Sequence, residues 1–271
     1  MISSIKHKTI FAFENTPSMV IQRLHVIPSD TQYQRLLSCD IDIVGGKLAL
    51  ESNDCHGNKV HLCVNEAGVS SMEIIISGRV NVTDNNGIIG PHDNSLPLEL
   101  YKNHTHLSKP GPRLRELGKK LKRSMPVEKN GGLDILHELS IRILEKIAYA
   151  KGKTNVGTSA ESAMEIGAGV CQDHTHAFIA VARLLGFSAR YVSGYLSSGD
   201  GQIYEATHAW AEVYVGNLGW VGFDVSNGIS PDERYIKIAT GFDYLDVVPI
   251  SGIRIGDGTE QISTEIKFSQ Q

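Results

Sequence analysis

Apolar and polar residues alternate along several short segments in the first hundred residues of the chain. The alternation is imperfect over residues 5–13, shorter strand-like runs occupy 36–43 and 59–64, and a longer run at 71–82 has three isoleucines at its centre. Residues that favour turns, among them the glycine pair at 45–46, separate these runs. Short strands at this spacing predict an antiparallel sandwich or barrel.

The pattern becomes helical after residues 84–112, a stretch with four prolines and little periodicity that we interpret as a connection between two domains. Apolar residues at helical spacing predict helices at 133–149 and 171–185. A short basic helix is expected at 113–123. The motif Thr158-x-x-Glu161 is expected to form the capping box of another short helix.

The remainder of the chain is predicted to be mostly β-strand. The expected strands are 189–195, 207–215, 220–225 and a last one at 262–268. In the second of these, alternation places His208, Trp210, Glu212 and Tyr214 on one face, opposite four small or apolar residues. The predicted fold class is therefore α+β, with an N-terminal antiparallel β-sandwich-like domain (1–100) followed by an α+β domain (101–271).

Composition narrows the function classes. A net charge of −4 argues against a general nucleic-acid binder, and no apolar run reaches the roughly 20 residues that a membrane span needs. The N-terminus lacks the apolar core of a signal peptide, so we expect a cytoplasmic protein with no membrane partner. The four cysteines form no C-x-x-C pair, which argues against a zinc ribbon, and we expect them to be free thiols.

Cys171 opens the predicted helix 171–185 and directly follows Gly169 and Val170. A thiol at the N-terminus of a helix lies near the positive end of the peptide dipoles and near unpaired N–H groups, which favour its thiolate form. The same N–H groups can donate to an oxyanion that develops during acyl transfer. The alternative is a small, buried helix residue with no chemical role.

His208 and Asp224 complete a candidate catalytic group. Taken singly, a histidine that starts a strand and an aspartate that ends one both have ordinary structural explanations. Two adjacent strands could place them side by side, facing the helix that begins at Cys171. A nucleophile needs a base within hydrogen-bond reach, and the base needs a group that fixes its tautomer. The three residues thus predict acyl transfer with Cys171 as nucleophile, His208 as acid and base, and Asp224 as the group that orients His208.

Four longer motifs surround these residues. They are Gly169-Val-Cys-Gln-Asp-His-Thr-His, Arg183-Leu-Leu-Gly-Phe-Ser-Ala-Arg-Tyr-Val-Ser-Gly-Tyr195, Thr207-His-Ala-Trp-Ala-Glu-Val213 and Gly219-Trp-Val-Gly-Phe-Asp224. In this order they resemble the bacterial transglutaminase-like superfamily. The segment from Ile5 to Val60 resembles the β domain that often precedes the core of that superfamily, so the resemblance covers nearly the whole chain.

The resemblance implies a papain-like α+β core with a Cys-His-Asp triad at Cys171, His208 and Asp224, and no cofactor. Members of the superfamily include thiol proteases, amidases and protein cross-linking acyl transferases. We expect a peptide or protein amide as substrate, and hydrolysis as the reaction. The alternatives are an amine-accepting cross-linking transglutaminase and a non-catalytic peptide-binding module with a blocked triad. Two departures from the superfamily pattern are His174, where an aromatic residue is usual, and Val225-Ser226, where Pro-Thr is usual.

A metal site is a further rival interpretation of the same residues. Cys171, His174, His176 and His208 are all potential zinc ligands. On a helix, however, His176 lies about 140° around the axis from Cys171, a poor spacing for one metal ion. We therefore expect no metal. The basic run 113–123 is interpreted as a solvated helix face, while Trp210 and Trp220 could line a cleft or belong to the core.

Overall fold

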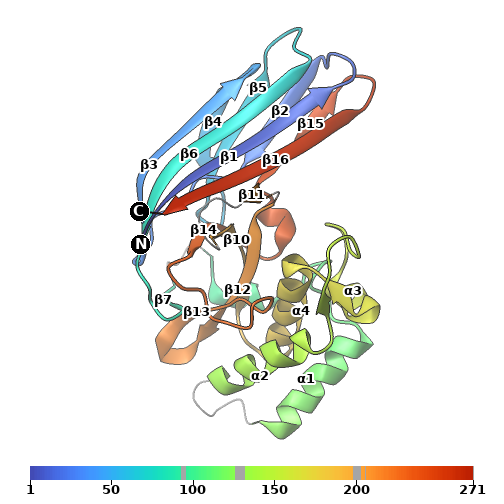
Figure 1. Ribbon diagram of the computed structural model, residues 1–271. Coiled ribbons are helices and arrows are strands. Elements are labelled where there is room, and N and C mark those ends of the chain that lie inside the picture. Colours follow the sequence, from blue (N-terminus) through green and yellow to red (C-terminus); the bar gives the residue numbers. More distant parts are fainter. Residues whose placement is uncertain (93–95, 126–131, 198–202, 205, 271) are drawn as a thin grey trace.

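The structure is a computed structural model that describes all residues except 93–95, 126–131, 198–202, 205 and 271. It has the predicted α+β class, with a β-sandwich at one end and a mixed helix-and-sheet part at the other (Figure 1). In the described part of the chain, no helix is both long and apolar enough to cross a membrane.

Two antiparallel sheets form the sandwich. One contains, in spatial order, β11 (Ile203–Tyr204), β16 (Glu260–Gln270), β1 (Ile2–Phe13), β6 (Ser71–Val82) and β3 (Gln34–Val44). The other contains β15 (Ile250–Ile255), β2 (Met19–Leu24), β5 (Lys59–Asn65) and β4 (Gly46–Asn53). Alternate residues of β1 and β6 are buried, as expected for strands that cover a core on one face. The expected strands at 5–13, 36–43, 59–64 and 71–82 are all present, whereas β2 and β4 were not predicted.

The last two strands of the chain belong to the sandwich by their hydrogen bonding. β16 pairs with β1 over eleven residue pairs, from Ser3 with Gln270 to Phe13 with Glu260, and β15 pairs with β2. The strand expected at 262–268 is thus present, but it completes a sheet that the first residues of the chain begin. The domain boundary near residue 100 stays a prediction. The structure adds that β15 and β16, near the C-terminus, pair with strands of the N-terminal sandwich.

The mixed part has a five-stranded antiparallel sheet with helices packed against it. Its strand order is β14 (Tyr235–Gly241), β10 (Ala189–Leu196), β12 (His208–Val215), β13 (Gly219–Phe223) and β7 (Ile88–Gly90). The helices are α1 (Pro112–Ser124), α2 (Leu133–Leu144), α3 (Ala160–Ile166) and α4 (Cys171–Leu184). Short 3-10 turns lie at η1 (Leu98–Lys102), η3 (Gly216–Leu218) and η4 (Tyr244–Asp246).

Helix α4 is the central element of this part. Every residue from Asp173 to Arg183 is buried, because α4 packs against α1, α2, α3 and the strands β10 and β12. One hydrophobic cluster joins α4 to the sheet through Phe178, Val213 and Phe223, and extends to Val80 and Phe268 of the sandwich. The two parts of the molecule therefore share a continuous core, and Cys171 lies at one end of its central helix.

The predicted helix at 133–149 is too long. Helix α2 ends at Leu144, and Ala148–Tyr149 (β8) instead pairs in parallel with Ala168–Gly169 (β9). The predicted capping box is also wrong. Ser159, one residue after Thr158, is the N-cap of α3 and accepts a hydrogen bond from the N–H of Ser162 at 3.2 Å.

Glu161 has a different task from the one expected. Its carboxylate leaves α3 and accepts hydrogen bonds from three backbone N–H groups at the start of α1, those of Gly111, Arg113 and Leu114, at 2.8–3.2 Å. A carboxylate at a helix N-terminus satisfies unpaired donors and complements the helix dipole. Glu161 thus ties α3 to α1, which the local sequence pattern could not show.

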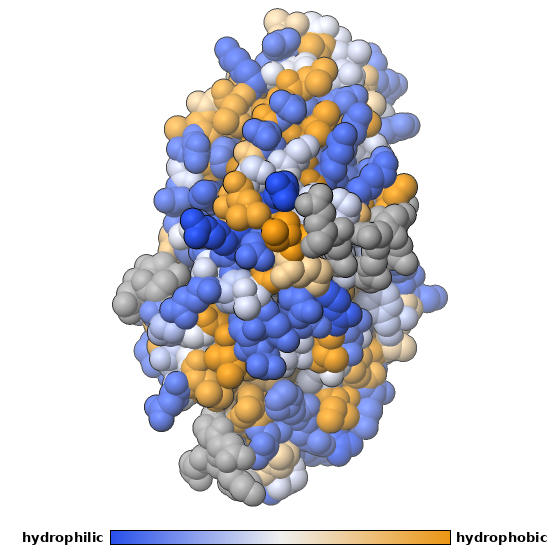
Figure 2. All heavy atoms as spheres, turned by 60° about the vertical axis from the view of Figure 1, so that its left-hand side comes forward, coloured by the Kyte–Doolittle hydropathy of each residue, from blue (hydrophilic) through white to orange (hydrophobic). Residues whose placement is uncertain are grey.

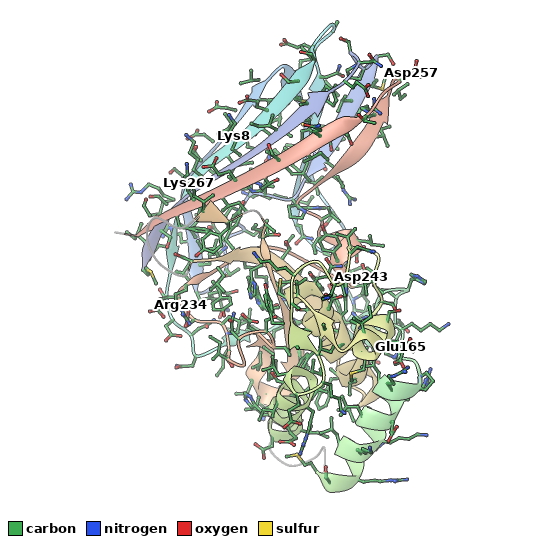
Figure 3. The ribbon with its side chains drawn as sticks, turned by 45° about the vertical axis from the view of Figure 1, so that its right-hand side comes forward. Lys8, Glu165, Arg234, Asp243, Asp257 and Lys267 are labelled. Atoms are coloured by element: carbon green, nitrogen blue, oxygen red, sulfur yellow. The ribbon has the colours of Figure 1, made fainter. Side chains whose placement is uncertain are left out.

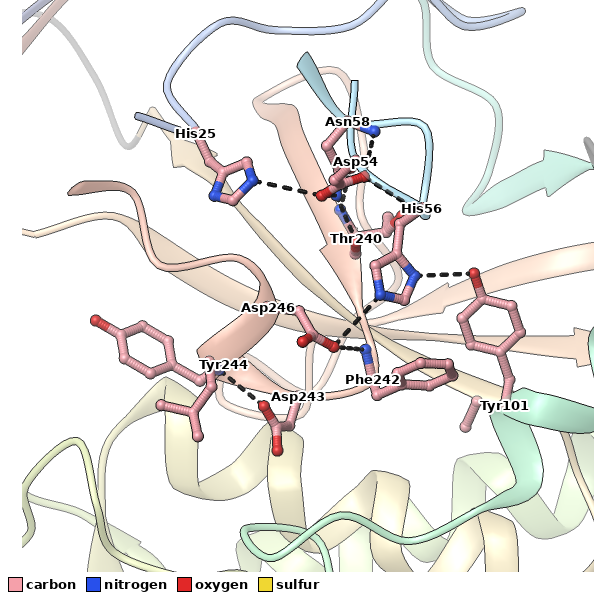
Figure 4. Close-up of polar contacts among 12 residues, drawn as sticks. His25, Asp54, His56, Asn58, Tyr101, Thr240, Phe242, Asp243, Tyr244 and Asp246 are labelled. Carbon is pink, nitrogen blue, oxygen red and sulfur yellow. Dashed lines mark hydrogen bonds and ion pairs between the residues drawn. The ribbon is translucent and has the colours of Figure 1, made fainter. Parts of the chain in front are cut away.

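Side-chain amides join the sandwich to the edge strand β14. Asn58 donates to the carbonyl of Thr240 and accepts from its N–H, both at 2.8 Å (Figure 4). Gln34 makes the same pair of bonds with Lys237, also at 2.8 Å. Each amide satisfies backbone groups that an edge strand would otherwise leave unpaired. β14 is consequently buried along its whole length.

Buried histidines reinforce the same junction. His25 lies 3.4 Å from Asp54, and His56 lies 3.4 Å from Asp246 and 3.2 Å from the hydroxyl of Tyr101 (Figure 4). Lys8 and Lys267 lie on the outside of the sandwich, and Glu165 lies on the outside of the helical part (Figure 3). The face in Figure 2 mixes apolar and polar side chains over the full length of the molecule.

Candidate active site

Cys171 is the first residue of α4, where the sequence pattern predicted it. The backbone before it is held by the buried carboxylate of Asp173, which accepts hydrogen bonds from the N–H of Val170 at 2.8 Å and from the hydroxyl of Thr154 at 2.6 Å. A β-carbon at position 169 would lie 2.6 Å from that carboxylate, so only glycine fits there. The turn that presents Cys171 is therefore fixed on both sides.

The backbone N–H groups of Cys171 and Gln172, at the start of α4, have no acceptor within the helix. The N–H groups of Asp173 and His174 both donate to the carbonyl of Val170, at 3.0 and 3.1 Å. Those of Cys171 and Gln172 precede the first such bond, as the geometry of helix N-termini requires. They are thus the donors nearest to the thiol that could bind an oxyanion.

The structure brings His208 and Asp224 together. His208 begins β12, Asp224 directly follows β13, and these two strands pair antiparallel. His208 Nε2 donates to Asp224 Oδ2 across 2.6 Å, and the aspartate side chain is completely buried. Because Nε2 is bonded to Asp224, Nδ1 is the ring nitrogen left to interact with the Cys171 thiol, which contributes to the raised pKa of His208.

Two further residues donate hydrogen bonds to the Asp224 side chain, and sequence reasoning missed both. Oδ2 also accepts from the side-chain amide of Asn227 at 2.6 Å and from the hydroxyl of Tyr235, in β14, at 2.7 Å. The N–H of Asp224 donates to the carbonyl of Ile229 at 2.8 Å, which closes a tight loop after the aspartate. A carboxylate held on all sides keeps one orientation, and so does the histidine bonded to it.

The charges of the pair follow from these contacts. Burial alone would lower the pKa of His208, but hydrogen bonds and charges from Asp224 and Cys171 raise it to about 10. Burial raises the pKa of Asp224, yet the hydrogen bonds from His208, Tyr235 and Asn227 outweigh burial and hold that pKa below its ordinary value. At neutral pH, His208 is therefore an imidazolium and Asp224 a carboxylate.

Cys171 and His208 line one cleft of about 880 Å³. Tyr149 and Tyr195 of the mixed part line it too, while Tyr204 of β11 and Phe268 of β16 come from a sandwich sheet. The sandwich therefore forms one wall of the cleft. Cys171 itself is partly exposed, so the thiol is reachable from solvent.

Both tryptophans belong to the core. Trp210 and Trp220 are each 1% exposed, and neither is among the described residues that line the cleft. The guanidinium of Arg190 stacks over Trp220 at 4.1 Å, and Trp210 packs edge-on against Tyr235 at 5.5 Å. The sequence left open whether the two tryptophans line the cleft or belong to the core, and the structure places both in the core.

The two departures from the superfamily pattern contact each other. His174 is fully buried, and its Nε2 donates to the carbonyl of Ile147 at 2.8 Å. Its Nδ1 lies 3.2 Å from the hydroxyl of Ser226 and accepts from it. A histidine in place of an aromatic residue thus gains a hydrogen bond from Ser226 in the loop after Asp224.

The remaining candidate ligands and carboxylates point elsewhere. His176 accepts a hydrogen bond from the N–H of Tyr244 at 3.2 Å, and burial lowers its pKa to about 3. Glu212 pairs with Arg190 and Lys237 on the far side of β12 from α4. Among the residues that the structure describes, no three His, Cys, Asp or Glu side chains are grouped as a metal site.

Comparison with known families agrees with this arrangement. The model of the transglutaminase-like superfamily core matches residues 119–225, and that of the bacterial transglutaminase-like N-terminal region matches residues 3–81. The chain belongs to the transglutaminase-like superfamily. The matched core contains Cys171, His208 and Asp224, and the transglutaminase-like fold is one that carries thiol-dependent acyl transfer.

Relatives of this transglutaminase-like chain include two mycobacterial proteins of unassigned function. One from Mycobacterium tuberculosis is 38% identical over 131 residues, which is 45% of this chain and 42% of that protein. One from Mycobacterium leprae is 35% identical over 130 residues, 46% of each chain. The chain thus matches less than half the length of these curated relatives.

A solved structure from Cytophaga hutchinsonii, described as a candidate cysteine protease, has a similar fold. It superimposes with a TM-score of 0.74 and covers 99% of this chain and 90% of that one, at 19% sequence identity. At that identity the similarity concerns the fold, including both the sandwich and the papain-like core.

Proposed function

We propose that this protein is a thiol-dependent acyl-transfer enzyme that acts on an amide bond of a peptide or protein, mainly by hydrolysis. The observation that carries the proposal is the shared cleft. Cys171 and His208 line the same cleft of about 880 Å³, and Asp224 lies buried behind His208 at 2.6 Å. An orienting carboxylate, a charged imidazole and a partly exposed thiol form the arrangement that nucleophilic acyl transfer needs.

In the first step, the Cys171 sulfur attacks the amide carbonyl, and a carbon–sulfur bond forms. The backbone N–H groups of Cys171 and Gln172 donate hydrogen bonds to the oxyanion that develops. The carbon–nitrogen bond then breaks, and His208 gives its Nδ1 proton to the leaving amine. A thioester remains on Cys171, His208 is neutral, and Asp224 keeps its negative charge throughout.

In the second step, water attacks the thioester. His208 Nδ1 takes one proton from the water, the carbon–sulfur bond breaks, and the thiolate–imidazolium pair is restored as a carboxylic acid leaves. An amine in place of water would give a new amide, which is the cross-linking alternative. The two reactions share every residue up to the thioester.

Tyr149 is our candidate for a second oxyanion donor. It lines the cleft, and its pKa is raised by burial and by the negative charges of Cys171 and Asp224, so its ring lies in the field of the site. A raised pKa keeps the phenol protonated and able to donate. Both tryptophans, which could have supplied an indole N–H, are in the core instead.

The test is to incubate the protein with a peptide library, with and without a fluorescent primary amine, and to identify products by mass. We expect cleaved peptides that carry new carboxyl groups, a minor fraction of amine adducts, and no product with Cys171→Ala. Cys55→Ala is the matched control, because Cys55 is exposed and outside the cleft. Products from Cys171→Ala would refute the proposal, and a majority of amine adducts would favour the cross-linking alternative.

A further inference from the structure

A second, smaller pocket adjoins the cleft. It has a volume of about 190 Å³, and the segment Ala206–Thr207, directly before His208, lines both hollows. One side of the pocket consists of residues of the neighbouring strands β1 and β16 of the sandwich. The other side consists of Tyr244 and the segment 248–250, so the sandwich and the mixed part build this pocket together.

The walls of this β1–β16 pocket are mostly apolar, with a polar strip along one side. The apolar residues are Phe11, Val248, Pro249, Ile250 and Ile262. The polar strip is a hydrogen-bonded chain: His7 Nδ1 lies 2.8 Å from the hydroxyl of Tyr195, His7 Nε2 lies 3.2 Å from the hydroxyl of Thr9, and that hydroxyl lies 3.1 Å from the hydroxyl of Thr264.

The pocket carries no charge at neutral pH on the described residues that line it. His7 is the one titratable imidazole there, and burial lowers its pKa to about 4, so its ring is neutral. A charged group that entered this pocket would lose its hydration without gaining an opposite charge. An uncharged group with a large apolar surface would gain free energy from the same desolvation.

Two residues connect the pocket to the reacting atoms. Tyr195 lines the catalytic cleft and bonds to His7 in the pocket. Tyr244 lines the pocket, and burial together with the negative charge of Cys171 raises its pKa, which places its phenol within electrostatic reach of the nucleophile. A side chain in the pocket would therefore belong to a residue close to the amide that Cys171 attacks.

We propose that the β1–β16 pocket is a substrate subsite that receives an uncharged aromatic side chain, phenylalanine or tyrosine, next to the scissile amide. The inference rests on the proposed function and names the substrate class for it. An engineered apolar cavity of about 150 Å³ binds benzene. A pocket of about 190 Å³ therefore has room for a phenyl or phenol group. The hydroxyl of Thr264, at the end of the polar chain, provides a partner for a phenol.

The experiment measures peptide binding to a Cys171→Ala protein, so that it does not depend on turnover. Blocked peptides that differ at one position, with Phe, Tyr, Ala, Asp or Lys, are titrated by fluorescence anisotropy, with the position moved along the peptide. Thr264→Trp fills the pocket. Ser263→Trp is the matched control, because neighbouring residues of β16 point to opposite faces and Ser263 is exposed and outside the pocket.

We expect the Phe and Tyr peptides to bind at least about tenfold more tightly than the Ala, Asp and Lys peptides at one position. Thr264→Trp should remove that preference and leave the Ala peptide within about twofold, and Ser263→Trp should retain it. Equal binding of all five peptides, or a preference that survives Thr264→Trp, would overturn the subsite. Selective binding without turnover of the same peptides by the wild type would instead contradict the proposed function and leave the subsite in place.

Discussion

The catalytic cleft and the β1–β16 pocket each contain a largely buried histidine, and one ring is charged while the other is neutral. His208 lies against the buried carboxylate of Asp224, and its pKa is raised to about 10. Among the described residues, the hydrogen-bond partners of His7 are the hydroxyl groups of Tyr195 and Thr9, and burial lowers its pKa to about 4. Burial penalises the cation in both places, so the difference comes from Asp224 and Cys171, which His7 lacks as partners.

The molecule thus keeps a reactive and a neutral imidazole in adjoining hollows. The two pKa shifts also give the free energy of unfolding two pH dependences of opposite sign. The contribution of His208 is present below the unfolded pKa of 6.5 and is lost as pH rises through about 10. That of neutral His7 is present above 6.5 and is lost as pH falls toward about 4.

The largest effect should follow Asp224→Asn. The variant removes the negative charge that raises the pKa of His208, so that pKa should fall. Turnover should fall by about 10²- to 10⁴-fold without being abolished. Peptide hydrolysis and NMR titration of the imidazole measure the two quantities. The melting temperature should also fall, because the imidazolium loses the carboxylate that stabilises it in the folded protein. A variant with near-normal turnover would mean that Asp224 does not orient His208.

The second effect concerns His7→Gln and acid stability. Between pH 6.5 and about 4 the unfolded chain binds a proton that His7 in the folded protein does not, so the wild type should lose on the order of 3 kcal/mol over this window. The variant should lose correspondingly less. Urea unfolding at pH 7 and pH 4.5 gives the difference. An identical pH dependence in both proteins would show that His7 is not held neutral.

Tyr235→Phe should have a moderate effect on the Asp224–His208 pair. Its hydroxyl donates to Asp224 at 2.7 Å, and a hydrogen bond to a charged group contributes about 1.5–3 kcal/mol. Removing it should raise the pKa of Asp224 and shift the acid limb of the activity profile upward, since the pair then loses its carboxylate at a higher pH. The profile of kcat/KM against pH is the measurement. Asn227→Ala, which removes another donor to the same oxygen, should shift the profile in the same direction.

The smallest effect should come from Glu161→Gln, a carboxylate that bonds to backbone rather than to histidine. It accepts from three N–H groups at the start of α1, so its replacement should reduce the free energy of unfolding by about 1 kcal/mol. Turnover should not change, because α1 does not line the cleft. Thermal melts and peptide hydrolysis compare the two properties. A loss of turnover that exceeds the loss of stability would contradict this separation.

The sequence pattern was sufficient for the elements that carry the candidate site. α4 was predicted to begin at Cys171, and β12 and β13 were predicted within one or two residues, because the periodicity of each is strong and local. The faces of β12 were also predictable, since side chains alternate along any strand. Ala211 and Val213 are in the core, as that alternation requires.

The missed features depend on contacts between distant residues. β14 is buried on both faces, so its sequence does not alternate between apolar and polar residues. Its Lys237 can be buried because the ammonium pairs with Glu212 and the backbone N–H bonds to the amide of Gln34. Tyr235 reaches Asp224 only when β14 is in register with β10. The pairing of β16 with β1 joins residues more than 240 positions apart, which no local window contains.

The central claim is that Cys171 is a nucleophile activated by a charged His208. Its most direct test is limited labelling with iodoacetamide at pH 6, followed by peptide mapping of all four cysteines in the wild type and in Asp224→Asn. Burial raises the pKa of Cys39 and of Cys63 to about 11, so exposed Cys55 is the relevant competitor. We expect Cys171 to be labelled first in the wild type and several-fold more slowly in Asp224→Asn, with Cys55 unchanged. Faster labelling of Cys55, or equal labelling of Cys171 in both proteins, would contradict the claim.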